Sequence, residues 1–317
     1  MLARFFQSGL GVLILIPLIL LIGTGIIVGY QIRSVTHPPR VVEQLHPKDF
    51  LMRADDINFQ STDGVPLTGW LIHGDREAPA IILCHDLGES KSVFLDSVVP
   101  LQRAGYNLFL FDFRGHGGSG GKGSTLGSAE RYDVQGAVDF LRTRRDLSSD
   151  RIGVWGVGMG AYAAALAALE RKELTALALD SIYPDVRAYL DQVLFRGVPA
   201  SASKVTGYAS FYYGPYFQWK ITRGEVAQAI PRLSDRNILF VAGDSRPLSV
   251  EISKELYASV PEGGGSDKNL LILGSSGVSN LYAEDRRKYE AAVTGFFGTY
   301  LRLRPEAAPA ALQVEVH

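Results

Sequence analysis

The longest apolar segment of the chain lies near its N-terminus. No residue between positions 5 and 32 is charged, and residues 10–28 include fourteen Leu, Ile or Val. About 20 apolar residues cross the roughly 30 Å hydrocarbon core of a bilayer, so residues 10–28 are expected to span a membrane as one helix. The run exceeds the apolar region of a signal peptide, about 7–15 residues, and no small-residue cleavage site follows it. We therefore predict an uncleaved anchor over residues 1–33.

Beyond the anchor, the hydrophobic pattern predicts a single α/β body. Residues 34–49 are polar and contain three prolines, which indicates a linker leading to a body at 50–302. Residues 57–61 and 67–73 alternate as two antiparallel strands around a turn. Compact apolar runs predict buried strands at 80–84, 107–111, 152–155, 176–179, 238–242 and 270–273. Amphipathic stretches predict helices at 127–144, 159–171, 248–259 and 284–302.

This alternation of short buried strands and helices predicts a mostly parallel sheet covered by helices on both faces. Residues 182–236 form a longer connection than one crossover needs, so we expect a small helical cap there, over the carboxyl edge of the sheet. Residues 303–317 are rich in Ala and Pro and are expected to form a flexible tail.

Composition and charge narrow the classes of partner. The chain is 46% hydrophobic, 21% charged and carries a formal charge of −1, without a cluster of Lys or Arg, so no nucleic-acid partner is expected. Its single cysteine, Cys84, cannot form an internal disulfide and is interpreted as a small buried hydrophobe. The anchor is followed by three basic residues, Arg33, Arg40 and Lys48, and preceded by one, Arg4. Because basic residues that flank a membrane span are enriched on its cytoplasmic side, this favours a cytoplasmic body.

The segment at 152–162, IGVWGVGMGAY, predicts a strand, a glycine turn and the start of a helix. Gly156-x-Gly158-x-x-Ala161 matches the dinucleotide-binding fingerprint, and Asp180 ends the next strand, where a ribose-binding acid would lie. That fingerprint normally follows the first strand of a nucleotide-binding unit, whereas several strands precede it here. Nucleotide binding therefore stays as one alternative.

Four segments at successive strand ends support a different interpretation. These are LCHDLGESK at 83–91, FDFRGHGGSGG at 111–121, GVGMGA at 156–161 and LDSIYPD at 179–185. In this order they resemble the α/β-hydrolase fold. THPPR at 36–40 and INFQSTDGVPLTGWLIHG at 57–74 further resemble bacterial membrane-anchored hydrolases of the serine-aminopeptidase type. The resemblance covers residues 36–302 and implies an α/β-hydrolase fold with a small cap.

The resemblance also identifies where a catalytic serine would stand. In this family the fifth strand ends in Gly-x-Ser-x-Gly, a sharp turn that exposes the nucleophile. Gly156 and Gly160 keep the small flanking residues of this elbow, but the nucleophile position is Gly158. Glycine has no oxygen with which to attack a carbonyl carbon.

The other two triad positions are altered as well. The acid position after the seventh strand is Arg246, and the base position after the eighth strand is Val278. No histidine occurs between His116 and His317, the last residue of the chain. We therefore expect that the ordinary Ser-His-Asp mechanism is not available.

The remaining polar candidates follow the expected strands. Oxyanion and pocket candidates are His85, Asp86, Leu87, Gly88, His116, Val157, Met159 and Asp180. The two histidines could form a relocated acid–base pair or a metal site, but they lack metal-ligand spacing. We favour hydrogen bonding within loops and expect neither metal nor cofactor. Asp180 could replace the missing acid or cap the following helix, and capping is favoured.

Two further groups of residues leave alternatives open. Ser119, Ser181 and Ser245 are stand-in nucleophiles, although none lies on the elbow. The aromatic stretch at 208–219 could line a ligand pocket or face a membrane, and packing within the cap is favoured.

We conclude that the sequence predicts a membrane-anchored pseudohydrolase that binds a small molecule or a protein. One alternative is an active hydrolase using displaced residues. The other is the nucleotide-binding protein described above.

Overall fold

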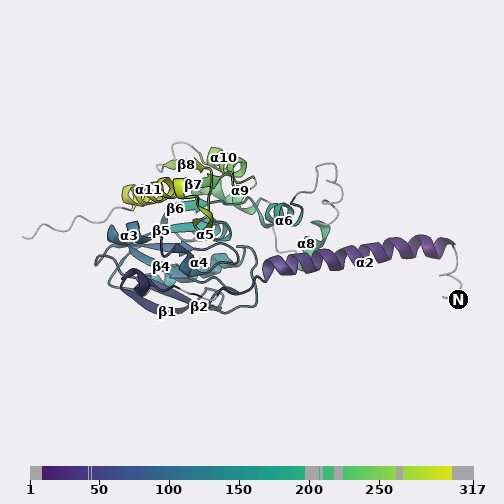
Figure 1. Cartoon of the computed structure of the whole chain (residues 1–317), viewed down its shortest axis with the longest axis horizontal. Helices are drawn as coiled ribbons and strands as arrows, with labels where there is room; N and C mark the ends of the chain where they lie inside the picture. The colour runs from purple at the N-terminus through teal and green to yellow at the C-terminus, as the bar shows by residue number, and fades with distance from the viewer. Residues whose placement is uncertain are drawn as a thin grey trace, which may run out of the picture.

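A long N-terminal helix projects from a compact α/β body in the computed structural model of the chain (Figure 1). The structure describes residues 9–41, 43, 45–196, 207, 210–217, 224–246, 248–261 and 267–301. The expected tail at 303–317 and parts of the expected cap lie outside the described residues.

An eight-stranded sheet in the order β1-β2-β4-β3-β5-β6-β7-β8 forms the centre of the body. Among the strands that the structure describes, β1–β2 and β2–β4 are the antiparallel neighbours and the other pairs are parallel. The mostly parallel sheet expected from the sequence is thus confirmed. The strands are β1 (Ala54–Gln60), β2 (Pro66–Ile72), β3 (Pro79–Cys84), β4 (Asn107–Phe111), β5 (Ser148–Val157), β6 (Leu174–Asp180), β7 (Asn237–Gly243) and β8 (Lys268–Leu273).

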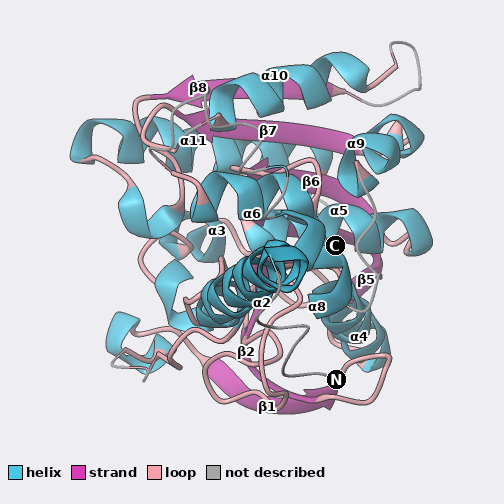
Figure 2. Ribbon diagram, turned by 90° about the vertical axis from the view of Figure 1, so that its right-hand side faces the viewer, coloured by secondary structure: helices cyan, strands magenta, loops and turns pink. Residues whose placement is uncertain are grey.

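Helices cover both faces of this sheet, as the sequence predicts (Figure 2). Successive side chains of a strand point to opposite faces, so Ile82 packs in one core while Ile81 and Leu83 pack in the other. The first core lies under α4 (Glu130–Thr143), α5 (Met159–Glu170) and α10 (Ser249–Ser259), and the second under α3 (Val99–Arg103) and α11 (Ala283–Tyr300). Short 3-10 helices complete the body at η1 (Pro47–Phe50), η2 (Lys91–Phe94) and η6 (Val278–Asn280).

The connection from β6 to β7 forms the helical cap expected at 182–236, within its described part. It contains α6 (Val186–Leu194), η4 (Ser210–Tyr212), α8 (Tyr213–Tyr216), α9 (Glu225–Ala229) and η5 (Ile230–Leu233). Of the aromatic stretch at 208–219, residues 210–217 are described. Tyr213 is fully buried, whereas Phe211 is 60% exposed. Core packing therefore accounts for only part of this stretch.

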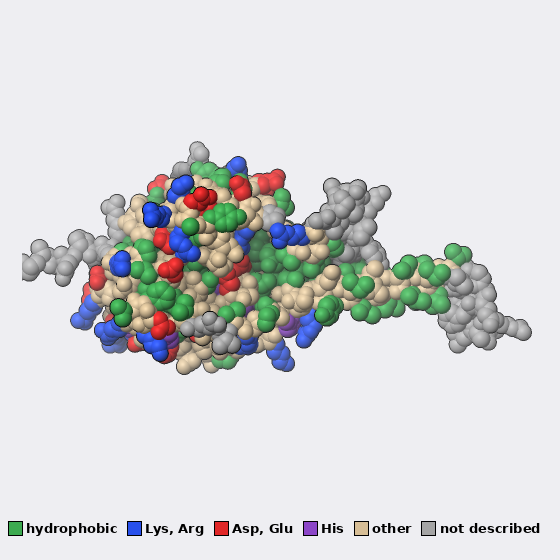
Figure 3. Space-filling model, in the orientation of Figure 1, with side chains coloured by type: hydrophobic (Ala, Val, Ile, Leu, Met, Phe, Trp, Pro, Cys, Tyr) green, Lys and Arg blue, Asp and Glu red, His purple; other side chains and the backbone are tan. Residues whose placement is uncertain are grey.

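The N-terminal helix α2 (Gly9–Thr36) is long and apolar enough to cross a membrane. Within Leu13–Thr36, an 18-residue stretch has a mean hydropathy of 2.5 and is almost entirely unburied, a pattern that a signal sequence also shows. Figure 3 shows hydrophobic side chains along α2 that continue onto the adjoining part of the body. The helix ends at Thr36 because His37 precedes Pro38, and a residue before proline avoids the helical conformation. Residues 34–36 of the expected linker are therefore helical.

Candidate functional site

The turn between β5 and α5 is centred on Gly158, whose backbone angles are φ 53° and ψ −111°. Residues with a side chain adopt this region only under strain, whereas glycine enters it freely. A Cβ atom on Gly160 would lie 2.1 Å from the carbonyl oxygen of Cys84, so α5 approaches the end of β3 very closely. The segment thus folds as the sharp strand–turn–helix junction that the glycine pattern predicts.

The carboxylate of Asp86 occupies the space directly above this turn. Its Oδ1 accepts hydrogen bonds from the backbone N–H of Leu87 at 2.8 Å and of Met159 at 2.9 Å. A Cβ atom on Gly158 would lie only 2.1 Å from the same oxygen. In α/β hydrolases the amide after the nucleophile and an amide of the loop after β3 form the oxyanion hole. Here the corresponding amides bind an anion that belongs to the chain itself.

Arg246, in the turn after β7, holds the second oxygen of this carboxylate. Its Nη1 donates to Asp86 Oδ2 at 2.7 Å, and the side chains of both residues are largely buried. Burial opposes the charge of the guanidinium, but the carboxylates of Asp86 and Asp180 raise the pKa of Arg246 above its ordinary value. Arg246 is therefore a permanent cation at this site.

Asp180, the last residue of β6, lies fully buried beneath Arg246. Its Oδ2 accepts hydrogen bonds from the backbone N–H of Gly277 and from the Tyr289 hydroxyl, both at 2.7 Å. Its Oδ1 accepts one from Ser181 Oγ at 2.8 Å. Burial raises the pKa of Asp180 despite these donors and the nearby guanidinium. The carboxylate joins β6 to the loop after β8 and to α11.

The expectation that Asp180 caps the following helix is wrong. Asp185 is the N-cap of α6, and its carboxylate accepts a hydrogen bond from the backbone N–H of Ala188 at 2.7 Å. Asp180 lies five residues before that cap, and its side chain turns inward to the donors beneath the sheet edge.

The two candidate histidines have both ring nitrogens occupied by backbone groups. His85 Nδ1 lies 2.7 Å from the Asp86 carbonyl oxygen, and its Nε2 accepts from the Phe113 N–H at 3.1 Å. His116 Nε2 accepts from the Gly88 N–H at 3.1 Å, and its Nδ1 lies 3.0 Å from a carbonyl oxygen two residues earlier. Burial lowers the pKa of His85 to about 4, so its ring is neutral near pH 7. These contacts match the loop-holding role favoured from the sequence. No cluster able to hold a metal ion occurs within the described residues.

The other candidates differ in their access to the turn. Val157 is buried at the end of β5, and Val278 is buried at the start of η6, on the face of the sheet covered by α11. Ser119 is also buried, with its Oγ donating to the carbonyl oxygen of Asp112. Ser181 and Ser245 both line the cavity described next.

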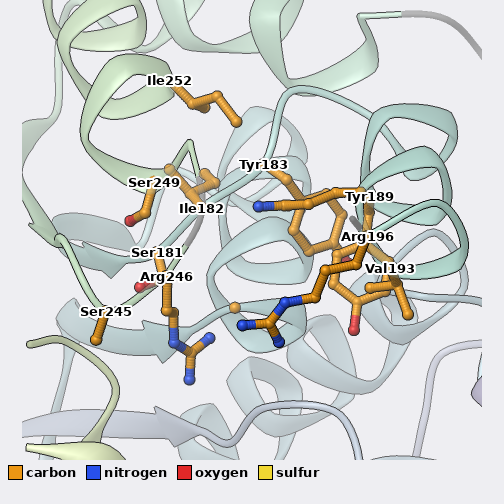
Figure 4. Close-up of a pocket in the computed structure, with 12 residues that line it drawn as sticks. Ser181, Ile182, Tyr183, Tyr189, Val193, Arg196, Ser245, Arg246, Ser249 and Ile252 are labelled. Atoms are coloured by element: carbon orange, nitrogen blue, oxygen red, sulfur yellow. The ribbon is translucent and has the colours of Figure 1, made fainter. Parts of the chain in front are cut away.

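A cavity of about 330 Å³ opens above Gly158 (Figure 4). Cap residues and the start of α10 supply most of its walls. Apolar or aromatic side chains come from Ile182, Tyr183, Tyr189, Val193 and Ile252, and polar ones from Ser181, Gln192, Arg196, Ser245, Arg246 and Ser249. The motifs of the sequence did not identify Tyr189, Arg196 or Ser249, because none of them lies in a recognisable pattern and only the fold of the cap brings them to the elbow.

The fold and the elbow define an α/β-hydrolase-fold protein. A family model described as serine aminopeptidase, S33, matches residues 75–209. The Pyrococcus furiosus esterase Pf2001 superposes with a TM-score of 0.66 and 27% identity over 84% of this chain and 99% of the esterase. The hydrolase GrgF from Penicillium, at 17% identity and a TM-score of 0.62, shares the fold over 80% of this chain and 100% of GrgF. The chain therefore has the α/β-hydrolase fold, and its residues 75–209 are similar in sequence to the serine aminopeptidase family.

Curated relatives are similar over a shorter length. YfhR of Escherichia coli O157:H7, an uncharacterized protein, is 28% identical over 44% of this chain and 51% of its own length. The α/β-hydrolase domain-containing protein WAV2 of Arabidopsis thaliana is 29% identical over 53% of this chain and 56% of its own length. The chain thus spans about half the length of the curated relatives that it matches.

Proposed function

We propose that this protein is a membrane-anchored, non-catalytic α/β hydrolase that binds a ligand in the cavity above Gly158, with its body on the cytoplasmic side. One observation carries the proposal. The Asp86 carboxylate, held by Arg246, lies on the two amides that would stabilise an oxyanion and above a residue that has no side chain.

The arrangement opposes acyl transfer at each step. An oxyanion hole works because its donors are aimed at the negative charge that develops on a substrate carbonyl oxygen. A carboxylate on the same donors would repel that charge. Gly158 supplies no nucleophile, and at the triad-equivalent positions Arg246 cannot accept a proton from an imidazole and Val278 has no ring nitrogen.

A second candidate is hydrolysis by a displaced serine, and Ser181 is the residue that favours it. Its φ is 52°, it lines the cavity, and its Oγ donates to Asp180 Oδ1 at 2.8 Å. A strained residue beside a carboxylate is a feature of nucleophile sites. The same oxygen also lies 2.8 Å from Ser276 Oγ, which is consistent with a structural hydrogen-bond chain instead.

Nucleotide binding at Gly156-x-Gly158-x-x-Ala161 has less support. The N–H of Gly158 donates to the Asp180 carbonyl oxygen at 2.8 Å, and that of Met159 donates to Asp86. These amides are the donors that a pyrophosphate would need, and the Asp86 carboxylate would repel it.

Labelling of the full-length protein in membranes with a fluorophosphonate probe tests the proposal, because this probe tags reactive serines. We expect no labelling, and no ester hydrolysis above that of empty membranes. The positive control is a rebuilt variant with Asp86→Gly, Gly158→Ser, Arg246→Asp and Val278→His. Labelling of the unaltered protein would overturn the proposal, and its loss in Ser181→Ala would establish the displaced-serine alternative.

A further inference from the structure

The cavity above Gly158 is lined by two guanidinium groups, of which, within the described part of the chain, one has an acidic partner and the other has none. Arg246 is paired with Asp86. Arg196, which follows α6, lines the same cavity, and among the residues that the structure describes it has no hydrogen-bond or ion-pair partner. Figure 4 shows both guanidinium groups directed into one space, from the cap and from the loop after β7. The Arg196 guanidinium therefore faces the cavity without a carboxylate partner among the described residues.

A buried hydroxyl without a partner lies in the same wall. Ser249, the first residue of α10, is 3% exposed and lines the cavity, and its Oγ has no hydrogen-bond partner. A buried polar atom that stays unpaired costs about 1–3 kcal/mol, so a bound acceptor would relieve this cost. The positive end of the α10 dipole also favours an anion at this position.

The rest of the lining is suited to an apolar group. Ile182, Tyr183, Tyr189 and Val193 come from the cap, and Ile252 comes from the next turn of α10. The Tyr183 hydroxyl donates to the carbonyl oxygen of Leu126 at 2.7 Å, and its ring packs against those of Tyr162 and Tyr189, which makes this part of the wall aromatic. The volume of about 330 Å³ is near the lower limit of ligand pockets, about 300–1,000 Å³, and suits one short chain rather than two.

The cap that forms this wall lies against the anchor. α2 contacts both α6 and η4, and the Tyr212 hydroxyl donates to the carbonyl oxygen of Leu21 at 2.7 Å. Leu21 lies about 10 Å before the end of the expected span at Val28, at a rise of about 1.5 Å per residue. A helix that spans the bilayer over residues 10–28 would thus place Leu21, and η4 against it, about 10 Å inside the hydrocarbon core, among the acyl chains. Phe211 in η4 and Val193 in α6 expose apolar surface on these elements.

From these observations we infer that the cavity binds a single-chain anionic amphiphile from the membrane, specifically a fatty-acid carboxylate. The carboxylate would lie between Arg196 and Ser249, and the chain would lie along the tyrosines of the cap. A single unpaired guanidinium matches a monoanion better than a phosphate dianion. This inference rests on the proposed non-catalytic function.

Calorimetric titration of the full-length protein in phosphatidylcholine nanodiscs tests the inference, with empty nanodiscs as the blank. Sodium decanoate should bind saturably at one site per chain. Decanol, which lacks the charge, and inorganic phosphate, which lacks the chain, should each bind at least about tenfold more weakly. Equal affinity for decanol would overturn the carboxylate assignment, and equal affinity for phosphate would overturn the lipid assignment.

Matched variants locate the site. Arg196→Gln should weaken decanoate binding about tenfold and Ser249→Ala roughly threefold, while Arg196→Lys should retain most of the affinity. Arg232→Gln is the control, because Arg232 is exposed on η5 and does not line the cavity. Arg196 is exposed, so its replacement leaves the fold intact, and circular dichroism checks this. Equal affinities of the Arg196→Gln and Arg232→Gln proteins would overturn the inference.

Fluorophosphonate labelling of the same preparation separates the two proposals. An unlabelled protein that binds no decanoate would refute only the ligand class. A labelled protein would refute the non-catalytic function on which the inference rests.

Discussion

Replacing Gly158 with alanine tests the central feature of the site, which is the carboxylate placed over a residue without a side chain. The new Cβ atom would lie 2.1 Å from Asp86 Oδ1 and 2.3 Å from its Cγ. Contacts this short cannot persist, so either the turn or the carboxylate has to move. The carboxylate is the end of a side chain, and we expect it to move.

The cost has two parts. Holding alanine at φ 53° and ψ −111° stores about 1–3 kcal/mol of backbone strain. Displacing the Asp86 carboxylate breaks its bonds to the Leu87 and Met159 amides and to Arg246, and a buried donor left unpaired costs about 1–3 kcal/mol. We therefore expect Gly158→Ala to lower the free energy of unfolding by about 4 kcal/mol, the sum of the midpoints of these two ranges.

A double-mutant cycle separates the two parts. Urea unfolding of the full-length protein in detergent, followed by tryptophan fluorescence, would compare Gly158→Ala in the parent and in an Asp86→Ala background. In the second background only the strain remains, so the cost should fall by at least about 1 kcal/mol. Gly298→Ala is the control, because Gly298 is exposed in α11 with nothing near its added Cβ, and it should be neutral or stabilising by up to about 1 kcal/mol. The same cost of Gly158→Ala in both backgrounds would refute the placement of Asp86.

Three further predictions concern the anchor, the buried acid and the elbow. After a carbonate wash the full-length protein should stay with the membranes, and its release would refute a spanning Leu13–Thr36. Because folding raises the pKa of Asp180, the folded state binds its proton more tightly, and stability falls as the pH rises from about 4 through the folded pKa. Asp180→Asn should therefore gain stability relative to the parent across this window, and parallel curves in urea titrations at several pH values would contradict this. Gly160→Ala should destabilise the protein by about 3 kcal/mol or more, because its Cβ would lie 2.1 Å from the backbone oxygen of Cys84. An unchanged unfolding midpoint would show that α5 and β3 are not in such close contact.

The sequence alone determined the features that depend on neighbouring residues. The apolar run at 107–111 corresponds residue for residue to β4, and the run at 80–84 to β3 with one residue added at its start. The spacing of apolar side chains along the chain and the small residues of turns depend only on neighbouring positions. They can therefore be recognised without knowledge of the fold. The same holds for α2, whose apolar length is visible in the chain, and for the spacing of glycines around Gly158.

Only the tertiary structure decided which side chains meet at the elbow. Asp86 and Arg246 are 160 residues apart in the chain, and nothing in the sequence around either residue indicates their ion pair. Arg196 and Ser249 come from the cap and from α10, and they reach the cavity only because the cap folds back over the carboxyl edge of the sheet. The role of Asp180 was mistaken for the same reason. A strand's last residue can turn toward the following helix or toward the interior, and the buried donors of Gly277 and Tyr289, contributed by distant segments, set its direction.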